Sequence, residues 1–173
     1  GARRPPTTPI DTIVAFLSRV PVRSGGVHAV VAPMFHSWGF AHAGLCLMDG
    51  CTLVVTRRFD PEGTLKLVDQ HRPRLLALVP VMAQRILALP ESTRARYDTA
   101  SLEIAALGGS AIPGDLATRF MDVFGDVAYN TYGSTEVAVV SIATPTDLRA
   151  APDTAGRPVD RIVVKLLDAD GEE

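Results

Sequence analysis

Cysteine is scarce in this sequence, with only Cys46 and Cys51 among its 173 residues. Two cysteines cannot form a disulfide framework, and no further Cys or His pair stands at the spacing of zinc ligands. Both lie in apolar stretches, where a free cysteine usually packs as a small hydrophobic side chain. We therefore predict neither a disulfide-rich fold nor a zinc site.

Long apolar runs are also missing. No stretch approaches the ~20 apolar residues that a membrane-spanning helix needs. The basic residues at positions 3 and 4 are not followed by the apolar segment of a signal peptide. These absences predict a cytoplasmic protein without a transmembrane segment, and they remain compatible with peripheral contact to a membrane.

Neither sign of charge is in large excess: the sequence has 17 Lys and Arg and 19 Asp and Glu, which gives a net charge of −2. The chain has no clustered basic run, so we expect no nucleic-acid partner. Hydrophobic residues make up 47% of the sequence, which argues against disorder. The composition suits one globular unit with a substantial core.

Apolar strand-like segments alternate with helix-like segments along the chain. The predicted strands lie at 27–32, 51–56, 74–79, 102–107, 126–131, 137–143 and 161–167. The predicted helices lie at 10–20, 37–49, 60–71, 80–89 and 113–124. Strands that alternate with helices and are apolar throughout predict an α/β fold, in which a largely parallel sheet carries helices on both faces.

Polar and glycine-rich residues follow several of the predicted strands, where open sheets of this type bind ligands. The segment 132–136 (YGSTE) offers an aromatic face, two hydroxyls and a carboxylate that suits Mg²⁺ bound with phosphates. It is equally compatible with a turn after a strand. The glycines of 108–110 (GGS) fit close approach to a ligand or a left-handed turn. From the residues alone, His36 and Trp38 could simply belong to the core.

Three segments together resemble the adenylate-forming, or AMP-binding, superfamily. They are 33–39 (PMFHSWG), 108–110 (GGS) and 132–136 (YGSTE), and their order and spacing match that family, as does the later 155–158 (AGRP). Within the superfamily, the first segment is most similar to fatty-acyl-CoA synthetases, the long-chain fatty-acid–CoA ligases. The resemblance implies the fold of the N-terminal domain of these enzymes.

The resemblance also implies a two-step reaction. A carboxylate attacks the α-phosphate of ATP to give acyl-AMP and pyrophosphate, and the thiol of CoA then displaces AMP to give acyl-CoA. The implied partners are therefore a fatty acid, ATP (with AMP as product) and CoA, with Mg²⁺ as the metal ion.

Roles for individual residues follow from their motif positions in the family. The implied catalytic residues are His36, Thr135 and Glu136, and Glu136 is also the implied metal ligand. The implied cofactor-binding residues are Gly108, Gly109, Ser110, Tyr132, Gly133 and Thr135, with the Tyr132 ring stacked on adenine and Thr135 bonded to the α-phosphate. The implied acyl pocket consists of His36, which would lie beside the reacting carboxylate, Trp38, which would line or gate the acyl tunnel, and Gly109.

Some parts of the family pattern have no counterpart in these residues. They are the phosphate loop ending in Pro-Lys-Gly, the Asp that binds ribose, and the catalytic Lys of the C-terminal domain. The resemblance therefore predicts that 1–173 are a partial AMP-binding domain, internal to the large N-terminal domain and inactive alone. Two alternatives stay open: an aryl- or amino-acid-activating enzyme, although 40–44 carries no acidic residue for a substrate ammonium, and a non-catalytic nucleotide-binding module.

Overall fold

The computed structural model describes residues 9–160 and 162–172, with side chains from residue 13 onward. Its strands are β1 (Val27–Val30), β2 (Thr52–Val55), β3 (Leu75–Leu78), β4 (Ile104–Gly108), β5 (Ala128–Ser134), β6 (Ala138–Ala143) and β7 (Arg157–Pro158). In this part of the chain they form one sheet in the order β2-β1-β3-β4-β5-β6-β7. The first five strands pair in parallel, and β6 and β7 continue the sheet in antiparallel fashion. The predicted largely parallel sheet is confirmed.

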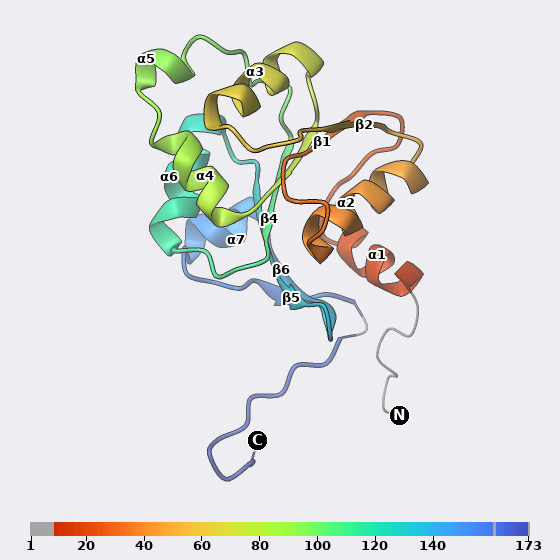
Figure 1. Cartoon of the computed structure of the whole chain (residues 1–173). Helices are drawn as coiled ribbons and strands as arrows, with labels where there is room; N and C mark the ends of the chain where they lie inside the picture. The colour runs from red at the N-terminus through yellow and green to blue at the C-terminus, as the bar shows by residue number, and fades with distance from the viewer. Residues whose placement is uncertain (1–8, 161, 173) are drawn as a thin grey trace.

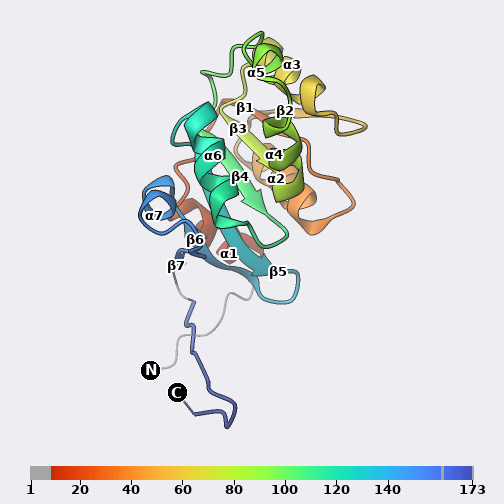
Figure 2. The same ribbon diagram turned by 90° about the vertical axis from the view of Figure 1, so that its left-hand side faces the viewer.

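Helices cover both faces of this sheet (Figures 1 and 2). One face carries α1 (Pro9–Leu17) and α2 (Ser37–Met48); the other carries α3 (Pro61–His71), α4 (Pro80–Leu87), α6 (Gly114–Phe124) and α7 (Pro145–Ala150), with the short α5 (Glu91–Arg94) beside α3. Residues along β3 alternate between the two faces, since Leu76 and Leu78 pack with the larger helix group and Leu75 and Ala77 with the smaller one. Among the described residues, no helix is both long and apolar enough to cross a bilayer.

Local signals in the sequence set the ends of several helices. Asp60 is the N-cap of α3, where its carboxylate accepts a hydrogen bond of 2.6 Å from the backbone N–H of Gly63, and Pro61 is the first helical residue. Gly125 ends α6 with a φ of 85°, a conformation that favours glycine. Both helix boundaries agree with the sequence prediction.

The short helix α7 lies between the last two predicted strands, where no helix was predicted. A capping box begins α7: the Thr144 hydroxyl accepts from the Asp147 N–H, and the Asp147 carboxylate accepts from the Thr144 N–H. Pro145 follows at the first helical position. The sequence therefore contained the capping signal of this helix, but the helix is too short to show a periodic pattern of apolar residues.

The strand predicted at 161–167 is wrong. Residue 161 lies outside the described residues, and 162–168 have no regular secondary structure. Val163, Leu166 and Leu167 are exposed. An apolar, β-branched run forms a strand only where a neighbouring strand accepts its backbone hydrogen bonds, and no described strand pairs with 162–168.

Candidate functional site

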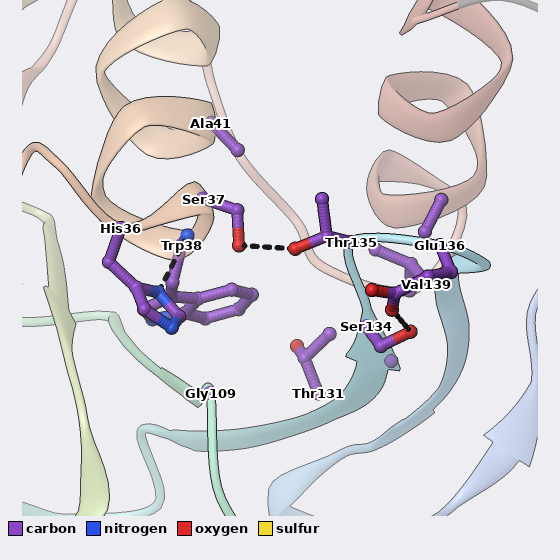
Figure 3. Close-up of a pocket in the computed structure, with 12 residues that line it drawn as sticks. His36, Ser37, Trp38, Ala41, Gly109, Thr131, Ser134, Thr135, Glu136 and Val139 are labelled. Carbon is purple, nitrogen blue, oxygen red and sulfur yellow. Dashed lines mark hydrogen bonds between the residues drawn. The ribbon is translucent and has the colours of Figure 1, made fainter.

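The predicted site residues lie around a cavity of about 390 Å³ between the N-terminus of α2, the end of β4 and the hairpin of β5 and β6 (Figure 3). His36, Trp38 and Gly109 lie on one side of it, and Ser134, Thr135 and Glu136 lie opposite. The complete lining set is His36, Ser37, Trp38, Ala41, Gly109, Thr131, Gly133, Ser134, Thr135, Glu136, Ala138 and Val139. Segments separated by about a hundred positions in sequence thus meet here.

His36 is placed in this cavity as the N-cap residue of α2. Its Nδ1 accepts a hydrogen bond of 3.2 Å from the backbone N–H of Trp38. The side chain is exposed, and the interpretation of His36 as a core histidine is therefore wrong. The Trp38 indole Nε1 donates to the carbonyl oxygen of Leu78 at 3.1 Å, which fixes the ring at the end of β3.

The two glycines at the end of β4, Gly108 and Gly109, have surroundings that disfavour any residue with a side chain. A Cβ at Gly108 would lie about 3.0 Å from the indole ring of Trp38, closer than side chains normally approach. Gly109 has a φ of 85°, which other residues rarely adopt, and a Cβ there would lie 3.4 Å from His36 Cε1. Gly108 therefore supports Trp38 from behind and does not line the cavity, whereas Gly109 does.

The hairpin that follows β5 carries the hydroxyls and the carboxylate. Ser134 Oγ donates to Glu136 Oε2 at 2.6 Å, and this bond, with a backbone hydrogen bond, holds the pKa of the Glu136 carboxyl below its usual range. Thr135 Oγ1 donates to Ser37 Oγ at 3.3 Å, a contact across the mouth of the cavity in Figure 3. Sequence reasoning gave Ser37 no role.

A second cavity of about 260 Å³ adjoins the first and contains Ser110 and Tyr132, two further residues predicted to bind the nucleotide. Tyr132 is 59% exposed and lines this cavity, so it does not belong to the core. Gly109, Thr131 and Gly133 line both cavities and form the wall between them. The complete lining set is Gly109, Ser110, Ala111, Ile112, Asn130, Thr131, Tyr132, Gly133, Asp153, Thr154 and Ala155.

β5 extends through Ser134 and pairs with β6, so Tyr132 and Gly133 lie inside a strand and not after it. The register shifts between Tyr132 and Gly133, which bends the hairpin toward α2. Successive residues of a strand face opposite sides, and Tyr132 lines the second cavity alone, whereas its neighbours Thr131 and Gly133 line both.

Sequence reasoning also missed Thr131. Its side chain is 5% exposed, and Oγ1 is buried without a hydrogen-bond partner among the described residues. Buried hydroxyls are usually paired, so this unpaired oxygen is an exception, and it belongs to a residue that lines both cavities. The signal in the sequence was only a threonine before the Tyr-Gly pair, a position at which many strands carry threonine.

The carboxylate and hydroxyl groups fit a metal ion bound together with phosphates. No cluster of three or more His, Cys, Asp or Glu side chains able to hold a metal exists in the described part of the chain. Glu136 is the one carboxylate among the residues lining the first cavity. Mg²⁺ is commonly held by one or two carboxylates together with substrate phosphate oxygens and water, and that donor set agrees with the role expected for Glu136.

Comparison with known proteins identifies relatives of this chain. The pattern of the AMP-binding enzyme family matches residues 10–173. A curated relative, 3-[(3aS,4S,7aS)-7a-methyl-1,5-dioxo-octahydro-1H-inden-4-yl]propanoyl:CoA ligase of Rhodococcus jostii, is 31% identical over 150 residues, which are 85% of this chain and 29% of the relative. Feruloyl-CoA synthase of an Amycolatopsis species is 38% identical over 110 residues, 63% of this chain and 22% of the relative. The chain thus spans less than a third of the length of these relatives.

Solved structures share the fold. The amide bond synthetase McbA from Marinactinospora thermotolerans matches with a TM-score of 0.85 and 24% identity, over 94% of this chain and 33% of that one. A fatty acyl CoA synthetase of Mycobacterium tuberculosis matches with a TM-score of 0.80 and 22% identity, over 92% of this chain and 32% of that one. The family match covers nearly the whole sequence, so the chain belongs to the AMP-binding enzyme family, among relatives that are CoA ligases.

Proposed function

We propose that these residues form the central part of the substrate site of an ATP-dependent acyl-CoA ligase. The observation that supports this proposal most directly is the pair of adjoining cavities that share the wall of Gly109, Thr131 and Gly133. The first contains His36, Trp38 and Gly109, which are expected to face an acyl group, together with Thr135 and Glu136, which are expected to face phosphate and metal. The second contains Ser110 and Tyr132, which are expected to face the rest of the nucleotide. A carboxylate and the α-phosphate of ATP would meet where the two cavities join.

Each side chain has a role that its chemistry can perform. The exposed ring of Tyr132 offers a face on which adenine can stack, and Thr135 can donate a hydrogen bond to a phosphate oxygen. His36 would lie beside the substrate carboxylate, where the ring carbon Cε1 faces Gly109. Glu136, charged at neutral pH, would hold Mg²⁺, which supplies positive charge next to the phosphates.

A fatty acid is the narrower proposal for the substrate. Trp38, Ala41 and Val139 give the first cavity apolar walls. One relative, 30% identical over 65% of this chain, is a long-chain-fatty-acid–CoA ligase of Bacillus subtilis. ATP and CoA would place the reaction in the cytoplasm. We further propose that the 173 residues alone do not catalyse it, because no Lys or Arg is among the described residues that line the two cavities, whereas the family's phosphate-loop and catalytic lysines offset the triphosphate charge.

The experiment measures pyrophosphate release by the complete ligase, by which we mean this chain together with the remaining segments that its relatives possess. A panel of fatty, aryl and amino acids is offered with ATP, and the 173-residue chain is assayed in parallel. We expect release with carboxylic acids of low polarity and none from the chain alone. No release with any acid would contradict the ligase proposal, and release by the chain alone would contradict its inactivity.

Glu136→Gln in the complete ligase is the matched variant, because it keeps the shape of the side chain and removes its charge. We expect adenylation to fall by at least about 100-fold, corresponding to the several kcal/mol that charge neutralisation at a metal supplies. The melting temperature should stay unchanged, since Glu136 is exposed. A variant with the full rate of adenylation would remove Glu136 from the site.

A further inference from the structure

The two cysteines of the chain meet where α2 ends and β2 begins. Gly50 has a φ of 66°, and its N–H donates to the carbonyl oxygen of Leu47 at 3.3 Å. The N–H of Cys51 donates to the carbonyl oxygen of Cys46 at 2.9 Å. This pair of bonds is a Schellman motif, in which the side chains of the first and last residues contact each other. Here those residues are Cys46 and Cys51, on either side of the C-cap residue Asp49.

The backbone geometry permits a disulfide between these cysteines. The hydrogen bond of 2.9 Å joins the two peptide units directly, so the Cα atoms of Cys46 and Cys51 lie no more than about 7 Å apart, the limit for a disulfide without backbone movement. Both thiols are free. Burial first, and then the proximity of Cys51 and a hydrogen bond with its thiol, raise the pKa of the Cys46 thiol to about 11. The sulfur atoms therefore already lie side by side.

The two thiols differ in their access to solvent. Cys46 is completely buried, and its raised pKa keeps the thiol protonated at neutral pH. Cys51 is only half-buried, and its Sγ lies 3.9 Å from the carbonyl oxygens of Arg23 and Asp49. An oxidant dissolved in water therefore reaches Cys51 first, and Cys46 reacts only through Cys51.

We propose that Cys46 and Cys51 form a reversible redox pair, in which a peroxide oxidises Cys51 and Cys46 then closes a disulfide. In the first step the Cys51 sulfur attacks hydrogen peroxide, the O–O bond breaks, and the products are a sulfenic acid and water. In the second step the Cys46 sulfur attacks the sulfenic sulfur. The S–S bond forms, the S–O bond breaks, and the hydroxyl group leaves as water with the proton of Cys46. In total, two thiols and one peroxide give one disulfide and two waters.

The pairing has a chemical consequence for Cys51. A sulfenic acid without a neighbouring thiol is oxidised further to a sulfinic acid, which ordinary thiols do not reduce. A disulfide is returned to two thiols by thiol–disulfide exchange. Cys46 therefore protects the junction of α2 and β2 from irreversible oxidation, and this role does not depend on the ligase function.

The experiment exposes the complete ligase to hydrogen peroxide, unfolds it in an alkylating reagent and digests it with trypsin. Cleavage after Arg23 and Arg57 releases the peptide 24–57, whose only cysteines are Cys46 and Cys51. We expect this peptide to lose the mass of two hydrogen atoms and to carry no alkyl group. Dithiothreitol added before alkylation should restore both alkylation sites. Oxidation of methionine adds oxygen and is thereby distinguished.

Two variants separate the roles of the thiols. Cys46→Ala keeps a small apolar side chain at the buried position and removes the second thiol, so Cys51 should end as a sulfinic acid that dithiothreitol does not reverse. The matched control combines Cys51→Ser with Thr52→Cys, which moves the thiol by one position. Successive residues of an extended chain face opposite sides, so this control should form no disulfide with Cys46.

Three results would overturn the inference. In wild type, they are a peptide 24–57 that keeps both alkylation sites, or one in which Cys51 gains oxygen while Cys46 is alkylated, and neither needs a variant to fold. The third is a disulfide that forms equally well in the control with the moved thiol, because proximity in sequence would then suffice without the Schellman motif. All three leave the ligase function standing, since pyrophosphate release tests it separately.

Discussion

Single side chains decide how the nucleotide cavity would recognise its ligand, and Tyr132 is the aromatic residue among those that line it. We expect Tyr132→Phe to keep ATP affinity, because the π-face remains. Tyr132→Ala should lose about 1–3 kcal/mol of stacking, or roughly 5- to 150-fold in affinity, by analogy with base stacking on aromatic side chains. Its ring is 59% exposed, so the melting temperature should change little.

Titration of the complete ligase with ATP, beside its thermal unfolding, checks this expectation. The alternative of a structural tyrosine would give the opposite pair of results, with a large loss of stability and unchanged affinity. Truncation of a buried aromatic side chain typically costs about 3–5 kcal/mol, which makes the two outcomes easy to separate.

Ser134 is expected to set the acid limit of the reaction. Its hydrogen bond to the Glu136 carboxylate is the largest cause of the lowered pKa of that group, so the carboxylate stays charged to a lower pH than usual. Ser134→Ala removes this bond and should raise the pKa toward its ordinary value. The acid limb of the pH–rate profile should then move to higher pH. A limb that does not move would mean that Glu136 ionisation does not control the rate.

At the scale of elements, the hairpin of β5 and β6 contains one strained residue. Ala138 has a φ of 60°, in the left-handed region that costs a residue with a Cβ about 1–2 kcal/mol. Ala138→Gly relieves this strain but also increases the conformational entropy of the unfolded chain, which opposes folding. We therefore expect a net stabilisation of up to about 1 kcal/mol. Ala151, with a φ of −146°, is a matched control at which glycine should destabilise. Denaturant unfolding of both variants measures the difference, and equal effects would contradict the strain.

The sequence predicted those elements whose signals are local. Asp60 and Pro61 predicted the start of α3. The Gly-Gly pair at 108–109 fitted either close approach to a ligand or a left-handed turn, and Gly109 has a φ of 85°. The strand at 161–167 failed because apolar composition does not reveal whether a partner strand is available. The shared wall of the two cavities could not be predicted either, since it depends on the alternation of Thr131 and Tyr132 along a strand that proved longer than expected.

At the scale of the whole molecule, lowering the pH should weaken the packing of α2 on the sheet and so lower the free energy of unfolding. His28 and His42 are both buried, and burial lowers the pKa of each from 6.5, that of His42 to about 4. The unfolded chain therefore binds more protons than the folded one between these values, and stability falls as pH decreases from about 6.5 to 4. For His42 alone the loss approaches about 3 kcal/mol.

Denaturant unfolding of the complete ligase across this pH range checks the expectation. His42→Gln should flatten the pH dependence, whereas His71→Gln, a substitution at an exposed position at the end of α3, serves as the control. An unchanged slope in His42→Gln would show that the ring is not buried in its neutral form.

The hydrogen bond between Ser37 and Thr135 joins positions 98 residues apart, and this has a consequence for synthesis on the ribosome. A nascent chain that has emerged only as far as β4 already carries His36, Trp38 and Gly109 but has no opposite wall. Contacts of such sequence separation form late in folding. The binding site should consequently be one of the last features to mature, so that a labelled acyl or nucleotide probe would report completed folding in stalled chains of increasing length.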